Sequence, residues 1–155
     1  MWEFTYERTI NAPPEQVFKL LVDLPGYPEW NPFLIQVAGP VELGGVVTGK
    51  SVLGRSTASF RHKIFDFVPN RRLCWRDFGL MARLVCGERS RHLEERAGRT
   101  HYRCDLKISG PLAGLVNVMF GDGLRRGIAA EAEAIEQACC GENARSGAQR
   151  ASSRP

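Results

Sequence analysis

The stretch Asp-Leu-Pro-Gly-Tyr-Pro-Glu-Trp-Asn-Pro-Phe, residues 23–33, separates two different periodicities in this chain. Residues 17–22 before it are mostly apolar, at the spacing of a helix with one buried face. Pro25 and Gly26 end that helix, because neither residue favours its continuation. Residues 33–37 after it have the β-rich composition of a strand. The stretch therefore predicts a short helix, a proline-rich connection with an aromatic pair, and then the start of a sheet.

The residues before this helix predict a strand and a helix start. Residues 2–10 alternate between apolar and polar side chains, as a half-buried strand does, and Arg8 is the one charged residue on the apolar face. Residues 11–15, Asn-Ala-Pro-Pro-Glu, favour a helix N-terminus, because proline suits the first turn and an acidic side chain complements the helix dipole.

The rest of the chain predicts a sheet followed by a long helix. Strands are expected at residues 33–37, 46–53, 57–68, 72–78, 82–94 and 99–109. From residue 112 to 139 the apolar period becomes helical. Gly121 and Gly123 predict a kink or a split there, because each glycine costs about 1 kcal/mol relative to alanine. We expect one domain over residues 1–140 and a disordered polar tail over residues 141–155.

This element order predicts an α+β fold. An antiparallel sheet exposes one apolar face that must be covered, and only the C-terminal helix is long enough to cover it. A strongly curved sheet around one helix leaves space between them, and such apolar clefts are typical ligand sites.

Composition excludes several classes of protein. The 155 residues carry a formal net charge of +4, which is weak for a nucleic-acid-binding domain, and we expect no specific nucleic-acid partner. No apolar run is long enough to predict a membrane span, and the acidic, alternating N-terminus does not resemble a secretory signal. Five cysteines are an odd number and form no disulfide pattern, so we expect a cytoplasmic protein.

Three phrases resemble one known superfamily. Residues 9–18, 27–33 and 69–75 are similar in sequence and order to those of SRPBCC or START-related helix-grip proteins, especially polyketide-cyclase and lipid-transport-like members. The resemblance covers about residues 2–138. It implies a curved antiparallel sheet of about seven strands around a long C-terminal helix, with two short helices after the first strand. It also implies an internal cavity for an apolar ligand.

Three side chains are weak candidates for catalysis. His62 shares the inward register of Phe60 and Ile64, where it could move a proton or orient a polar group, but a satisfied core histidine, or an outward one if a bulge shifts the register, is the favoured interpretation. Arg8 could grip a carboxylate or phenolate at the cavity mouth, but a surface arginine is the favoured interpretation. Tyr102 is the third candidate.

The ligand cavity is expected to take its walls from large inward side chains of the sheet and helix. The candidates are Trp30, Phe33, Phe60, His62, Trp75, Tyr102, Cys104, Leu115, Met119 and Phe120. Trp30 and Phe33 could instead simply pack under the sheet edge, and a cysteine such as Cys104 is more often a small buried apolar residue than a ligand. Metal, phosphate-loop and nucleophile-elbow motifs do not occur, so no metal or cofactor is expected.

Three functions remain open from the sequence. The preferred one is a binding protein, a monomer or weak homodimer, that holds a hydrophobic or aromatic small molecule, lipid-like or polyketide-like, between sheet and helix. The alternative is an enzyme, a polyketide aromatase/cyclase or dehydratase that uses histidine, arginine or tyrosine groups of the cavity. A third possibility is an interaction module whose cavity is filled by side chains.

Overall fold

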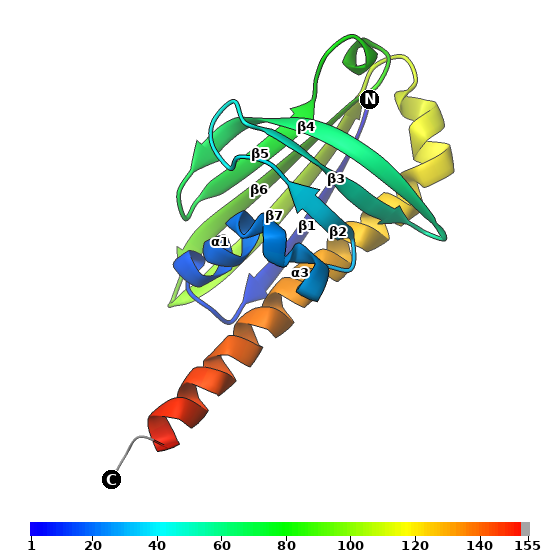
Figure 1. The fold of residues 1–155 in the computed structure, drawn as a ribbon. Coiled ribbons are helices and arrows are strands. Elements are labelled where there is room, and N and C mark those ends of the chain that lie inside the picture. The colour runs from blue at the N-terminus through cyan, green and yellow to red at the C-terminus, as the bar shows by residue number, and fades with distance from the viewer. Residues whose placement is uncertain (153–155) are drawn as a thin grey trace.

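The computed structural model describes residues 1–152 and contains one sheet, three α-helices and two short 3-10 helices (Figure 1). In chain order the elements are β1 Trp2–Ile10, α1 Pro14–Val22, η1 Leu24–Gly26, α2 Tyr27–Trp30, β2 Leu34–Ala38, β3 Val46–Leu53, β4 Ser56–Val68, β5 Arg72–Asp77, η2 Met81–Arg83, β6 Cys86–Arg96, β7 Arg99–Ser109 and α3 Ala113–Ser152. The sheet has seven antiparallel strands in the order β1-β7-β6-β5-β4-β3-β2. This is the α+β helix-grip fold that the sequence predicts.

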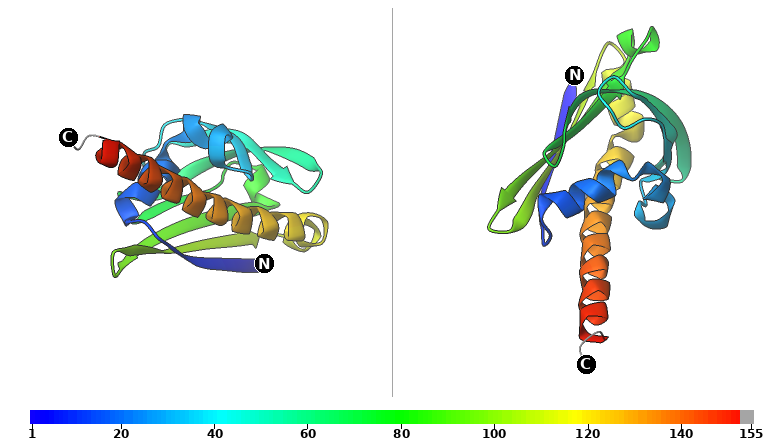
Figure 2. Two further views of the ribbon diagram at one scale, coloured as in Figure 1. Left: turned by 90° about the horizontal axis from the view of Figure 1, so that it is seen from below. Right: turned by 60° about the vertical axis from the view of Figure 1, so that its left-hand side comes forward.

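The sheet is curved, and its turns and irregularities follow from the sequence. Ala97 and Gly98 form the two-residue turn between β6 and β7, and both have positive φ angles, 53° and 76°. That geometry matches the right-handed twist of the flanking strands. The β4–β5 register shifts between Ile64 and Asp66. Such a bulge increases local twist and bend, which helps the sheet curve around α3 (Figure 2).

The core lies between the concave face of the sheet and α3. The alternating pattern of β1 appears as alternating burial, and Ile10 at its end is fully buried. Ile128, Ala132 and Ile135 form the buried stripe of α3. Tyr27 of α2 is also fully buried, and its hydroxyl donates a hydrogen bond of 2.6 Å to the Leu21 carbonyl. The aromatic segment after α1 is therefore fixed against the core.

The long helix differs from the sequence prediction at its glycines. α3 is one continuous helix through Gly121 and Gly123, where a kink or split was expected. A Cβ at Gly123 would lie 3.4 Å from the backbone nitrogen of Gly54, and one at Gly127 would overlap the Phe33 ring. At Gly127 the missing side chain lets the helix approach Phe33 closely without breaking, whereas a Cβ at Gly123 would make ordinary van der Waals contact with Leu53 and Gly54.

The helix also continues beyond the expected domain. α3 runs to Ser152 and projects past the sheet, where a disordered tail was predicted from residue 141 (Figure 1). A helix already held by its buried part can lengthen cheaply, because propagation adds a hydrogen bond for each residue fixed. Residues 153–155 of the predicted tail lie outside the described residues. The domain limits themselves remain a prediction.

Candidate ligand cavity

A cavity of about 460 Å³ lies between the concave sheet face and α3. Its floor comes from β4, β5, β6 and β7, and Leu124 and Ile128 of α3 close it from the other side. Phe33 and Leu34 form one end, and the segment between β5 and β6, residues 78–85, contributes side chains at the other. The volume is within the range of sites that hold drug-sized molecules.

One wall of the cavity is a row of aromatic rings. The Phe60 and His62 rings stack with centroids 4.7 Å apart. Trp75 on the neighbouring strand stacks with both, at 6.5 Å from Phe60 and 6.2 Å from His62. The row arises because Phe60 and His62 are two residues apart on β4 and therefore face the same side of the sheet. It offers a flat apolar surface to a ring-containing ligand.

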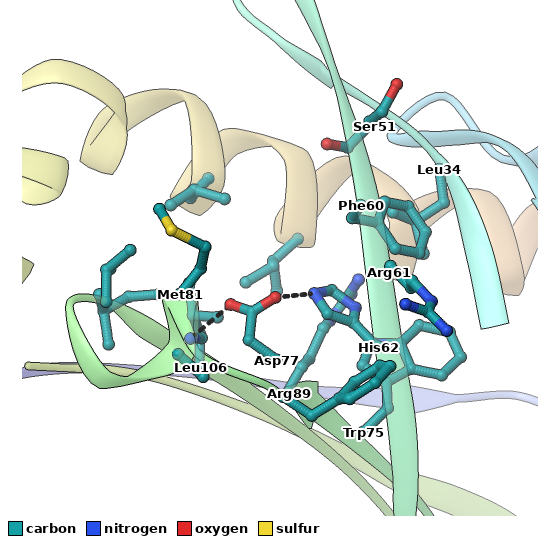
Figure 3. Close-up of a pocket in the computed structure, with 18 of the residues that line it drawn as sticks. Leu34, Ser51, Phe60, Arg61, His62, Trp75, Asp77, Met81, Arg89 and Leu106 are labelled. Carbon is teal, nitrogen blue, oxygen red and sulfur yellow. Dashed lines mark hydrogen bonds and ion pairs between the residues drawn. The ribbon is translucent and has the colours of Figure 1, made fainter. Parts of the chain in front are cut away.

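His62 forms a polar pair with Asp77 within this wall (Figure 3). The two residues are cross-strand partners on β4 and β5, and His62 Nε2 lies 3.1 Å from Asp77 Oδ1. The other oxygen, Oδ2, accepts a 2.8 Å hydrogen bond from the Gly87 amide. The buried Nδ1 of His62 has no partner among the described residues. The carboxylate thus fixes one ring nitrogen and leaves the other without a bond.

A second polar group lies deeper, where β6 meets α3. Arg89 and Arg91, two residues apart on β6, both point inward to the buried Glu131 of α3. Arg89 Nη2 donates to Glu131 Oε2, and Arg91 Nη2 lies 3.4 Å from Oε1. The Asn31 side-chain amide also donates to Oε1, at 2.7 Å. We call Arg89, Arg91 and Glu131 the charge cluster.

Glu131 and the two arginines support one another's ionisation, although Arg89 opposes the positive charge of Arg91. Burial alone would raise the pKa of Glu131, but Arg89 and Arg91 outweigh burial and hold that pKa below its usual value. Burial opposes the charge on Arg89, yet its Cys104 and Glu131 neighbours leave the pKa of the guanidinium above its ordinary value. The cluster therefore contains two positive charges and one negative charge, a net charge of +1.

Four of the ten expected cavity residues line this cavity: Phe33, Phe60, His62 and Trp75. Tyr102, Cys104 and Trp30 lie in or beside the core and do not line it. Tyr102 is fully buried with an unpartnered hydroxyl, and burial raises its pKa. Cys104 accepts a hydrogen bond of 3.2 Å from Arg89 Nε. Trp30 packs edge-on against Tyr27, as the simple packing interpretation expects.

The other expected site residues lie away from the cavity. Leu115, Met119 and Phe120 are on the first turns of α3, where their side chains face solvent, with 56, 61 and 36% exposure. The helical period of the sequence predicts a helix in this region. It does not predict which residues of that helix the sheet covers. Arg8 pairs with Glu136 of α3 at 2.6 Å and contacts the Tyr6 hydroxyl at 3.3 Å. It links β1 to α3 instead of facing the cavity.

Sequence reasoning missed three residues at the site: Asp77, Arg89 and Glu131. A usable signal was present for two of them. Arg89 has the same register as the buried Leu93, and Glu131 interrupts the apolar stripe of α3. Charged residues at buried positions on two facing elements indicate a pair. Asp77 had no such signal. It belongs to the site because it lies opposite His62 in the register of β4 and β5, and the sequence alone does not give that register.

The described residues contain neither a cluster of metal ligands nor a membrane helix. No group of three or more histidine, cysteine, aspartate or glutamate side chains within residues 1–152 is placed to hold a metal ion. No helix in that range is long and apolar enough to cross a membrane. All five cysteines are free thiols.

Comparison with solved structures shows the same fold in several proteins of low sequence identity. An aromatase/cyclase, Zhui, from a Streptomyces species is 18% identical with a TM-score of 0.74, covering 89% of this chain and 93% of that one. Ara h 8.0201 is 17% identical with a TM-score of 0.70, covering 90% and 98%. The Aha1 dimer from Colwellia psychrerythraea is 19% identical with a TM-score of 0.67, covering 90% and 96%.

The sequence comparisons add the family. A search of curated proteins found no match. The model of the family described as "Polyketide cyclase / dehydrase and lipid transport" matches residues 1–139, which include every strand of the sheet and the buried part of α3. This chain therefore belongs to the polyketide cyclase/dehydrase and lipid transport family, within the SRPBCC helix-grip superfamily.

Proposed function

We propose that this protein binds an apolar or aromatic small molecule in the cavity between its sheet and α3. The observation that carries the proposal is the cavity of about 460 Å³ with its stacked wall of Phe60, His62 and Trp75. If side chains had filled this cavity, the interaction module would have been favoured over a small-molecule binding protein. Membership of a family described by polyketide cyclisation and lipid transport supports a lipid-like or polyketide-like ligand. The five free cysteines support a cytoplasmic location.

Native mass spectrometry of gently purified protein tests this proposal. A ligand should appear as an adduct of a few hundred daltons that is absent from the denatured mass, as expected for a pocket of this size. Leu124→Trp should abolish the adduct, because Leu124 lines the cavity and the larger ring would occupy it. Met119→Trp is the matched control, since Met119 is on the same helix with its side chain in solvent.

The two variants also define the result that would contradict the proposal. Folded Leu124→Trp protein that carries the same adduct as the wild type would place the ligand elsewhere. If the wild type carries no adduct, titration with naphthalene-based probes decides, and failure of every probe to bind would reject the proposal.

A second candidate function is acid–base catalysis on a polyketide-like chain, and the His62–Asp77 pair is the observation that favours it. Asp77 holds Nε2 of the imidazole and Nδ1 has no partner among the described residues, so Nδ1 would take a proton from a carbon between two carbonyl groups once a bound substrate uncovers this buried atom. The same nitrogen could return the proton to a departing hydroxyl in a cyclisation and dehydration.

Product analysis with a poly-β-keto substrate tests this second function. His62→Gln should abolish turnover and leave binding intact, because glutamine fills a similar space without basic nitrogen. Asp77→Asn should slow turnover less, since Asp77 positions the imidazole without touching substrate. An unchanged rate in His62→Gln would exclude the histidine from the reaction.

A further inference from the structure

One hydrogen-bond donor of Arg89 makes no hydrogen bond within the part of the chain that the structure describes. Its Nε donates to Cys104 Sγ at 3.2 Å and its Nη2 donates to Glu131, whereas Nη1 makes no hydrogen bond to the described residues 1–152. The side chain is only 6% exposed, and Arg89 is part of the cavity wall. Figure 3 shows it rising from the sheet floor beside His62 and Trp75. An unused guanidinium donor therefore borders the cavity.

The whole charge cluster has more donors than acceptors. Arg91 also has two donors, Nε and Nη1, without partners among the described residues, and it is fully buried with its guanidinium 4.2 Å above the Trp75 ring. Among the described residues, Glu131 is the only carboxylate that pairs with either arginine. Buried charge is costly unless it is paired, so a net charge of +1 favours a negative group in the adjacent space.

The other charged groups that line the cavity do not neutralise the charge of Arg89. Asp77 is the carboxylate in the lining, and both of its oxygens are engaged, by His62 and by the Gly87 amide. Arg61 also belongs to the lining, but its side chain is exposed and lies over the Phe78 ring at 4.8 Å. Arg89 is thus the buried cation of the cavity wall.

We propose that the ligand carries an acidic oxygen, a carboxylate or an ionised phenol or enol, which binds Arg89 Nη1 while its apolar body lies against the aromatic wall. This inference rests on the proposed function and names the chemical class of its ligand. A charge-assisted hydrogen bond inside an apolar cavity is stronger than a neutral one. A site built around such a donor rejects neutral analogues, because the donor is then left without a partner.

Two probes of nearly the same shape test the inference: naphthoate, which carries a carboxylate, and acetylnaphthalene, which has a neutral ketone at the same ring position. Calorimetric titration of the wild type should show tighter binding of naphthoate. Arg89→Met should weaken naphthoate binding about tenfold to a hundredfold, the loss expected for one hydrogen bond to a charged group. Acetylnaphthalene should bind this variant about as well as it binds the wild type.

Two further variants separate the direct bond from general effects. Arg91→Met removes the same charge from the cluster, but Arg91 is not in the cavity wall, so it should weaken naphthoate binding less than Arg89→Met does. Arg89→Lys keeps the charge and should retain part of the preference for naphthoate. Arg89→Met should fold, because Glu131 keeps Arg91 and Asn31 as partners, and its thermal melting curve checks this.

Naphthol distinguishes the two sources of the acidic oxygen. Its absorption spectrum changes on ionisation, so a bound phenolate is visible at a pH where free naphthol is protonated. A phenolate spectrum that Arg89→Met abolishes identifies phenols or enols as ligands. A protonated spectrum together with tight naphthoate binding identifies carboxylates.

The outcomes that overturn the inference differ from those that overturn the proposed function. Equal or weaker binding of naphthoate relative to acetylnaphthalene in the wild type rejects the inference and leaves cavity binding intact. Equal losses for both probes in folded Arg89→Met protein also reject it. Failure of the wild type to bind any naphthalene probe rejects both proposals.

Discussion

Glu131 is the residue on which the charge cluster depends. It is fully buried and bonded to Arg89, Arg91 and Asn31, so removal of its charge leaves two buried guanidinium groups without a counter-ion. We predict that Glu131→Gln lowers the free energy of unfolding by about 3–5 kcal/mol, as breaking a buried ion pair does. Urea denaturation measures the change.

A triple variant provides the control for this stability prediction. Arg89→Met, Arg91→Met and Glu131→Leu together remove the cluster without leaving an unpaired charge. This variant should be more stable than Glu131→Gln, because replacement of a whole buried ion cluster by apolar groups is often neutral or stabilising. Equal losses in the two proteins would mean that packing, not charge, makes Glu131 important.

Glu131 also gives stability a defined pH dependence. Its two arginine neighbours hold its pKa below the ordinary value in the folded protein, so the folded state binds this proton less readily than the unfolded state. Its contribution is present above the unfolded pKa of about 4.3 and is lost as pH falls through the lower folded pKa. Unfolding free energies measured from neutral pH to pH 3 should fall more steeply in the wild type than in Glu131→Gln.

Strand alternation in the sequence predicts which side chains point to the inner face of the sheet, and to that extent it predicts the site. Phe60, His62 and Trp75 are expected on the inward face, and in the structure all three line the cavity. Alternation does not determine depth along a strand, so it gave no reason to separate Tyr102 in the closed core from His62 in the cavity. It also cannot identify a partner on another element, and so Arg89 and Glu131 were missed.

Among the elements, α3 packs against its neighbours in a way that requires a glycine at Gly127. We predict that Gly127→Ala lowers the free energy of unfolding by about 1–3 kcal/mol, because the added methyl overlaps the Phe33 ring and overpacking of a core has this cost. Gly114→Ala is the matched control on the same helix, since a Cβ there meets open space. Thermal melts that rank the two variants equally would contradict the close contact between Phe33 and α3.

The C-terminal part of α3 should be separable from the domain. Residues 145–152 are exposed and project beyond the sheet, whereas Gln16 of α1 reaches the Cys139 carbonyl and Glu142. We predict that a chain ending at residue 144 loses helical signal in circular dichroism but keeps its thermal midpoint and its probe binding. A truncated chain with a lower midpoint would show that the projecting turns stabilise the domain.

The sequence predicts the bounds of an element well where a single hydrophobic periodicity marks it. It predicts them poorly where contacts with distant parts of the chain determine the structure. Residues 46–53 and 99–109 were predicted as strands with the observed bounds, because alternation and turn residues both mark them. Residues 82–94 were expected as one strand, but β6 begins only at Cys86 after the short helix η2. Gly127 weakens a helix in isolation, and the Phe33 ring that explains this glycine is distant in sequence.

For the whole molecule, the fold and the family restrict the function without specifying the ligand. The same architecture occurs in an aromatase/cyclase and in Ara h 8.0201 at less than 20% identity, and a shared fold does not by itself identify a function. The distinguishing features are local: the His62–Asp77 pair and the free donor of Arg89. Strand alternation places His62 and Arg89 on the inward face, but it does not show how either residue is paired.

The segment between β5 and β6 has a consequence for rates. Met81 is part of the cavity lining, yet it is 67% exposed, so a ligand that enters or leaves at this end passes a side chain with few fixed neighbours. We predict that Met81→Ala accelerates association and dissociation of naphthoate together and changes the dissociation constant little, in stopped-flow experiments. Arg89→Met should change dissociation alone, because that contact forms only in the final complex. Met81 would thus control how fast the ligand exchanges, whereas Arg89 would control which ligand is retained.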